Sequence, residues 1–167
     1  MKLLNTILFS VFFVSFSFAQ KQKCNFNLNE KDPQSGIEKK HIMTDINNQF
    51  QVWTNNNGGS YKIGLEITMT ELQKDIINKG DTMTILLSNN DVLLAIADDK
   101  YLPVGKADEM TESTTYYPFY SVSANDWNTL GTNNIQVLKI KLGKEYYNFE
   151  INDSKAKKLK QAIICVK

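Results

Sequence analysis

Strict alternation of apolar and polar residues over positions 61–69 constrains the fold more than any other feature of this 167-residue chain. Successive side chains of a β-strand point to opposite faces of a sheet, so the pattern predicts a strand with one buried face and one wet face. The residues between the apolar positions are lysine, glycine, glutamate and threonine. The apolar positions are Tyr61, Ile63, Leu65, Ile67 and Met69.

The chain predicts three hairpins. Residues 50–52 also alternate, and the Asn-Asn-Gly-Gly sequence at 56–59 tolerates positive φ, so it joins them to the strand at 61–69. Residues 83–87 and 92–97 flank a tight turn at Asn89 and Asn90, and their nearly continuous apolar content predicts central strands covered on both faces. Residues 138–142 and 147–151 alternate around Gly143, which suits the first position of a type II′ turn.

Helical periodicity is clear only at the C-terminus. After the capping residues at 152–154, four apolar residues recur at spacings of three and four, opposite a face of lysines. This predicts an amphipathic helix with Leu159 and Ile163 buried against the sheet. A shorter helix is expected at 123–130, with Ser123 as its N-cap and Gly131 as its stop. Residues 71–78 fit either a short helix or a loop.

These elements predict a mainly β (α+β) fold. Residues 24–28 alternate and return as a strand within 37–46, which adds a further antiparallel pair. We expect an antiparallel sheet or compact β-sandwich of hairpins, with one C-terminal amphipathic helix packed on it. A parallel α/β fold is disfavoured because the chain has too few helices for the crossovers.

The N-terminus predicts export. Met1 and Lys2 precede an apolar run to Phe18, and small residues at 17 and 19 precede a polar stretch, as at a signal-peptidase site. We expect residues 1–19 to be a cleaved signal peptide and residues 20–167 to be one domain of the periplasm or cell exterior. The alternative, an uncleaved membrane anchor, is disfavoured because the run is short and interrupted by serines.

Charge argues against a nucleic-acid partner. Without Lys2 the mature chain has 18 lysines against 18 acidic residues, and it has no arginine. A nucleic-acid binder usually carries a basic excess, and bidentate phosphate recognition needs a guanidinium. Beyond that exclusion, an envelope glycan or protein is the expected class of partner.

Two cysteines, Cys24 and Cys165, lie near the ends of the mature chain. An oxidising compartment favours joining them, and two cysteines allow one intramolecular pairing. Two separate buried thiols, or a disulfide between two molecules, remain the alternatives.

The segments at both ends of the mature chain carry a resemblance. The stretch 24–32, the alternating 147–151 and the terminal Ala156, Leu159 and Cys165 resemble small exported proteins of unknown function from bacteroidete-type bacteria. The resemblance implies no activity and no site residues. The cysteines near both mature termini of those proteins support pairing Cys24 with Cys165.

Candidate catalytic and metal-binding residues are few. His41 is the one histidine, and it follows a charged stretch without a nucleophile motif nearby. The spacing of Cys24, His41 and Cys165 lacks the short intervals of a structural zinc site. The acidic residues Asp98, Asp99, Asp108 and Glu109 surround a predicted loop without a calcium-loop pattern. We therefore expect no metal and no cofactor.

Aromatic residues are the strongest candidates for binding. In a strand, Tyr116 and Tyr120 face one side, while Tyr117 and Phe119 face the other. If the first pair is exposed, it forms a stacking platform for a sugar or peptide, with Tyr101 and Trp127 as neighbours. Ordinary packing in the sheet is the alternative.

The expected function is a non-enzymatic binding or accessory domain of the cell envelope. The alternative is a small envelope-polymer hydrolase that uses acidic residues or His41.

Overall fold

The computed structural model describes residues 24–71, 73–107 and 112–167. Its strands and helices confirm the mainly β, α+β prediction. The elements are β1 (Leu28–Lys31), β2 (Glu38–Asn47), β3 (Phe50–Asn57), β4 (Ser60–Met69), β5 (Thr82–Leu87), β6 (Val92–Ala97), β7 (Val104–Ala107), β8 (Glu112–Tyr116), β9 (Phe119–Val122), α1 (Ala124–Thr132), β10 (Ile135–Leu142), β11 (Glu145–Glu150) and α2 (Asp153–Val166).

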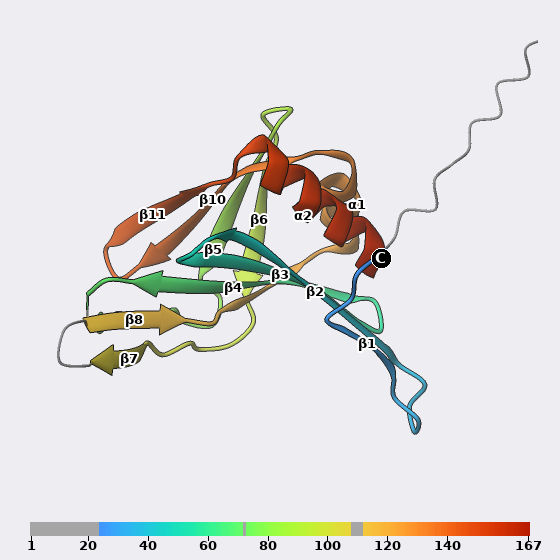
Figure 1. Cartoon of the computed structure of the whole chain (residues 1–167), viewed down its shortest axis with the longest axis horizontal. Helices are drawn as coiled ribbons and strands as arrows, with labels where there is room; N and C mark the ends of the chain where they lie inside the picture. Colours follow the sequence, from blue (N-terminus) through green and yellow to red (C-terminus); the bar gives the residue numbers. More distant parts are fainter. Residues whose placement is uncertain (1–23, 72, 108–111) are drawn as a thin grey trace, which may run out of the picture.

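All strands of the described residues belong to one antiparallel sheet (Figure 1). Its main path runs β1-β2-β3-β4-β9-β6-β5-β10-β11, and β8 joins β7 to the end of β4. The three predicted hairpins appear as β3–β4, β5–β6 and β10–β11. The central strand β9 is short, and it pairs with β4 on one side and β6 on the other.

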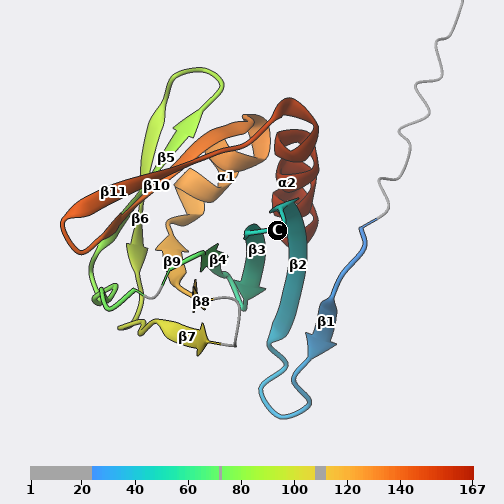
Figure 2. The ribbon, with the colours of Figure 1, turned by 60° about the vertical axis from the view of Figure 1, so that its left-hand side comes forward.

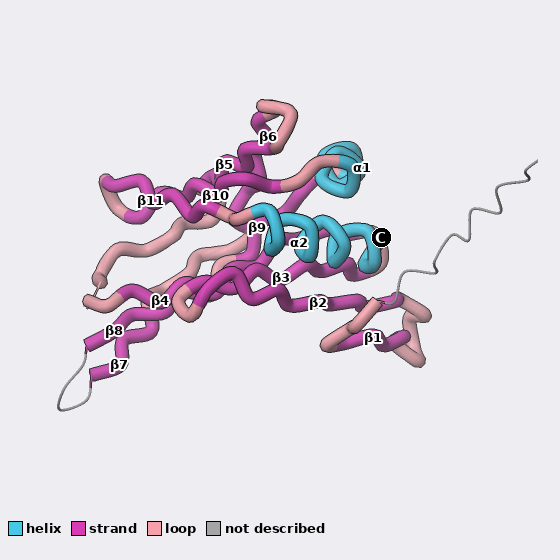
Figure 3. The backbone as a smooth tube through the Cα atoms, turned by 45° about the horizontal axis from the view of Figure 1, so that its top comes forward, coloured by secondary structure: helices cyan, strands magenta, loops and turns pink. Residues whose placement is uncertain are grey.

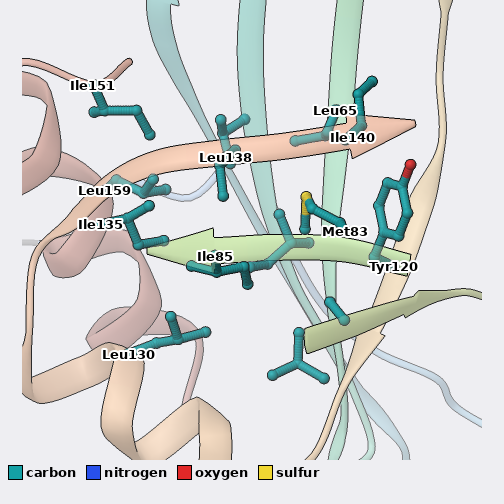
Figure 4. Packing of buried hydrophobic residues seen from close by; sticks show 14 of the residues in the cluster. Leu65, Met83, Ile85, Tyr120, Leu130, Ile135, Leu138, Ile140, Ile151 and Leu159 are labelled. Atoms are coloured by element: carbon teal, nitrogen blue, oxygen red, sulfur yellow. The ribbon is translucent and has the colours of Figure 1, made fainter. Parts of the chain in front are cut away.

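The sheet bends so that its two arms lie opposite each other (Figure 2). One arm holds β2, β3 and β4, and the other holds β6, β5, β10 and β11. Figure 4 shows Leu65 from one arm, Ile85 and Leu138 from the other and Tyr120 from β9 around a common interior. The alternating apolar residues of each hairpin therefore form a single core between the arms.

Two helices lie beside each other at the end of the molecule where the arms diverge (Figures 1 and 3). The helix α2 packs on β2, β3, β10 and α1, with Leu159 and Ile163 fully buried as predicted. The Asn152 side chain caps it by accepting from the Lys155 N–H at 3.0 Å. None of the helices in the described residues is long and apolar enough to cross a membrane.

Ser123 is the N-cap of the helix α1, as predicted. Its hydroxyl accepts a hydrogen bond from the Asp126 N–H at 3.1 Å. The prediction that Gly131 ends this helix is wrong, because α1 continues to Thr132. At Gly131 a Cβ would lie 3.8 Å from Ile164, an ordinary contact with α2. The ambiguous residues 71–78 form no helix in their described part, where Ile77 makes an isolated bridge to Tyr101.

A disulfide joins Cys24 to Cys165, with 5.7 Å between the two Cα atoms, as predicted. It ties the first described residue to the last turn of α2. The predicted signal peptide lies outside the described residues.

The expectation that β5 and β6 are covered on both faces is wrong for both strands: on β5, Thr82 is exposed and Thr84 and Leu86 are half-buried, and the outer face of β6 is more open still. Val92, Leu94 and Ile96 are 57%, 58% and 52% exposed, whereas Ala95 and Ala97 between them face the core. No element of the described chain packs on the outer face of this strand closely enough to bury them. An apolar sequence alone does not reveal that one face is left open.

Candidate functional site

The predicted tyrosine platform is not exposed. Tyr116 and Tyr120 are buried, because their strands turn that side of the sheet toward the core. The Tyr116 hydroxyl donates to the Asp75 carbonyl at 2.9 Å. Burial raises the pKa of both phenols above the ordinary value. Tyr116 and Tyr120 face the same side of the sheet, as predicted. The exposed side, however, is the one that carries Tyr117 and Phe119.

Trp127 is also a core residue. Its ring stacks on Tyr61 with 4.9 Å between centroids, and its Nε1–H donates to the Ile163 carbonyl at 3.3 Å. It thereby joins α1, β4 and α2. A ring held on these contacts cannot stack on a ligand.

Tyr101 belongs to a polar cluster at the end of β6. Its hydroxyl donates to the Asp98 carboxylate, which also pairs with the Lys62 ammonium at 2.5 Å. Burial alone would raise the pKa of Asp98, but the hydrogen bonds from Lys62 and Tyr101 outweigh it and leave that pKa below the ordinary value. Burial and the hydrogen bond to Asp98 raise the pKa of Tyr101. The cluster fixes a carboxylate and an ammonium beside the outer face of the sheet.

An aromatic cluster lies on that outer face, which we define as His41, Trp53 and Phe119. The His41 and Trp53 ring centroids are 4.9 Å apart, and those of Trp53 and Phe119 are 6.0 Å apart in an edge-to-face arrangement. The cluster joins β2, β3 and β9, which the sheet brings together across β4. All three rings keep part of their surface accessible to solvent.

Gly64 makes room for this cluster. It pairs with both Trp53 and Phe119 across the sheet, and a Cβ at this position would lie 2.5 Å from the Phe119 ring. The ring therefore occupies the space that a side chain at this position of β4 would need. A glycine inside an alternating strand is the sequence signal for such a close approach, and it could have directed attention to its neighbours.

The cluster borders a shallow trough of about 320 Å³ across β2, β3 and β4. Its walls combine rings, side-chain amides and charged groups: His41, Asn55, Asn57, Lys62, Asp98 and Phe119. Pockets for polar ligands pair an apolar wall with a few directed polar groups, which is the composition found here. The arrangement can hold a ligand that has an apolar face and hydroxyl or amide groups on its edge.

His41 contributes a ring rather than a base in this arrangement. Burial lowers the pKa of His41, so its imidazole is uncharged at neutral pH. Within the described residues no hydrogen bond joins the imidazole to a carboxylate or hydroxyl that would orient it for proton transfer. The uncharged imidazole packs against the Trp53 indole at a tilt of 33°.

The buried Nε1–H of Trp53 has no acceptor among the described residues. A buried donor without an acceptor costs free energy. Trp53 was missed in the sequence because its partners lie on other strands.

The described residues contain no group of three or more His, Cys, Asp or Glu side chains placed to hold a metal ion. Of the acidic residues around the predicted loop, Asp98 is engaged by Lys62 and Tyr101. Asp108 and Glu109 lie outside the described residues.

No protein-family model, no curated protein and no solved structure matches this chain significantly.

Proposed function

We propose that the protein is an exported, non-enzymatic binding domain of the cell envelope, and that its trough holds a saccharide. The observation that carries the proposal is the joint presence of aromatic rings and side-chain amides at the trough, on the outer face of the sheet. Sugar rings present apolar C–H faces to aromatic side chains and hydroxyl groups to amides and ions. The disulfide is compatible with export.

Phe119 and the polar walls have separate roles in this proposal. Phe119 supplies a stacking wall whose position is fixed by Gly64 and Trp53. Asn55 supplies an amide that can donate and accept, and the Lys62–Asp98 pair supplies a donor and an acceptor held in place by Tyr101. The ligand would lie across the strands, from β2 toward β9.

Calorimetric titration with soluble peptidoglycan fragments and envelope polysaccharides tests the proposal. We expect binding by the unmodified protein and at least about fivefold weaker binding by Phe119→Ala, since losing one stacking ring costs about 1–3 kcal/mol. Asn55→Ala should weaken binding without disturbing the rings. Tyr146→Ala is the matched control, because that ring is 60% exposed on β11, far along the sheet from the trough, and should leave affinity unchanged.

Two results would contradict the proposal. One is the absence of binding to any saccharide by the folded protein, and the other is equal affinity for Phe119→Ala and the unmodified protein. The same mixtures distinguish the hydrolase alternative. Mass spectrometry should detect no shortened saccharide after incubation, whereas release of fragments that depends on an acidic residue or on His41 would establish catalysis.

A further inference from the structure

A second surface of the molecule is apolar where a sheet normally meets water. Val92, Leu94 and Ile96 lie on the outer face of β6, each more than half exposed. Leu86 and Val137 from the neighbouring strands line a depression beside Val92. Single exposed aliphatic residues are ordinary, but a continuous row on one strand marks an interaction surface.

The same strand has a free backbone edge. β6 pairs with β5 over Val92–Ile96, but with β9 only at Ile96 and Ala97. After Val122, the last residue of β9, the chain leaves the sheet, because Ser123 is the N-cap of α1. The edge of β6 next to Val92 and Leu94 is therefore without a neighbouring strand.

The direction of the free groups follows from the hydrogen bonds on either side. On the side of β5, the Gly80 N–H donates to the Ala97 carbonyl and the Ala97 N–H donates to the Asp81 carbonyl. On the side of β9, the Asp98 N–H donates to the Phe119 carbonyl. Backbone groups alternate in direction along an antiparallel strand. Val92 and Leu94 therefore direct their N–H and C=O groups to the open side, while Leu93 and Ala95 bond to β5. In the described chain no backbone group bonds Val92 or Leu94 on that side.

We propose that β6 accepts an extended peptide segment of another protein as an additional strand. The segment would bond to the N–H and C=O groups of Val92 and Leu94 and place alternate apolar side chains beside theirs. Strand addition of this kind takes affinity from main-chain hydrogen bonds and specificity from side chains at alternate positions. Exposed edges are usually blocked by charge, proline or a covering element, and from Val92 to Leu94 this edge carries no charged residue, no proline and no paired strand.

The size of the surface favours a peptide over a second copy of the chain. The outer face of the arm formed by β6, β5, β10 and β11 has an area of only about 400 Å². This figure takes four strands of about six residues, with roughly 4.8 Å between strands and 3.3 Å per residue. A stable interface between two folded proteins needs about 800 Å² on each partner. A single added strand requires a much smaller surface. Its main-chain hydrogen bonds would go to the free backbone groups of Val92 and Leu94.

Hydrogen exchange followed by NMR tests the proposal with a defined probe. The probe is a short peptide with valine at alternate positions, threonine between them and a lysine at each end. We expect the peptide to slow exchange of the Val92 and Leu94 amides by about tenfold or more. The Leu93 and Ala95 amides are an internal control, because they already bond to β5 and should keep their protection.

Variants separate the backbone contribution from the side-chain contribution. Leu94→Pro removes an edge N–H that no ladder bond uses, so it should abolish binding while the sheet persists. Leu94→Thr keeps the N–H and should weaken binding, which covers the case in which the proline variant fails to fold. Leu102→Thr is the matched control, since Leu102 is 61% exposed in the segment that follows β6, outside the row of Val92, Leu94 and Ile96, and should leave binding unchanged.

Three outcomes would overturn the proposal: unchanged exchange at Val92 and Leu94, peptide binding by folded Leu94→Pro or Leu94→Thr equal to that of the unmodified protein, or dimerisation that the Leu94 variants abolish. Sedimentation without peptide detects the last of these, which would make a second copy the occupant. None of these measurements depends on saccharide binding at the trough.

Discussion

At the scale of single residues, Gly64 decides whether the aromatic cluster can exist. The absence of a side chain lets the Phe119 ring lie over β4, against the edge of Trp53. A methyl group there would overlap the ring at 2.5 Å, so the ring must leave its position. The trough would then lose its stacking wall.

Gly64→Ala should destabilise the protein by about 1–3 kcal/mol, the usual cost of overpacking. It should also shift Trp53 fluorescence to longer wavelength, because Phe119 no longer shields that indole. Gly131→Ala is the matched control: its methyl group would meet Ile164 at an ordinary 3.8 Å, and helix propensity should stabilise α1 by about 0.5–1 kcal/mol. Urea unfolding and emission spectra measure both. An unchanged stability and spectrum for Gly64→Ala would show that the ring is not held by this contact.

At the scale of elements, alternation predicted the hairpins because a strand with one buried face has a two-residue period. The same signal fixed the sides of Tyr116 and Tyr120 relative to Tyr117 and Phe119. It could not say which side faces the core, because that depends on how the sheet bends around β9. For the same reason, the apolar sequence of β6 could not reveal its open outer face. The position of Phe119 beside Trp53 depends on the pairing of β4 with β9, two segments that lie far apart in the sequence.

The helix α2 is an element whose packing can be tested directly. Leu159 is fully buried among residues of both arms, so Leu159→Asp removes an apolar side chain and places a carboxylate in the core. The lost packing alone costs about 2–5 kcal/mol, and the buried charge adds to it. We expect loss of the cooperative melting transition in circular dichroism. Lys157→Asp, on the exposed face of the same helix, should melt close to the unmodified protein. Similar melting curves for the two variants would mean that α2 contributes little to the fold.

At the scale of the whole molecule, the disulfide joins two ends that the sheet alone does not connect. Cys24 precedes β1, which projects from the sheet with its turn to β2 (Figure 3), and Cys165 lies in the last turn of α2. Besides the disulfide, the C-terminal end is held by the Asn56 side chain, which donates to the Val166 carbonyl at 2.8 Å. Much of the α2 packing, including Leu159 and Ile163, does not require the covalent link.

Reduction of the disulfide should therefore lower the free energy of unfolding but leave the protein folded. The bond closes a loop with a sequence separation of 141 residues, for which the loop-entropy account gives at most about 5 kcal/mol at 25 °C. This acts on the unfolded chain, which becomes more expanded when the bond is broken, so the dependence of unfolding on urea should also steepen. Urea unfolding with and without reductant measures both effects, and the double variant Cys24→Ser, Cys165→Ser should match the reduced protein and ignore the reductant. Equal unfolding free energies for the oxidised and reduced chains would show that residual structure already keeps the two ends of the unfolded chain close together, so that the covalent bond adds no stability.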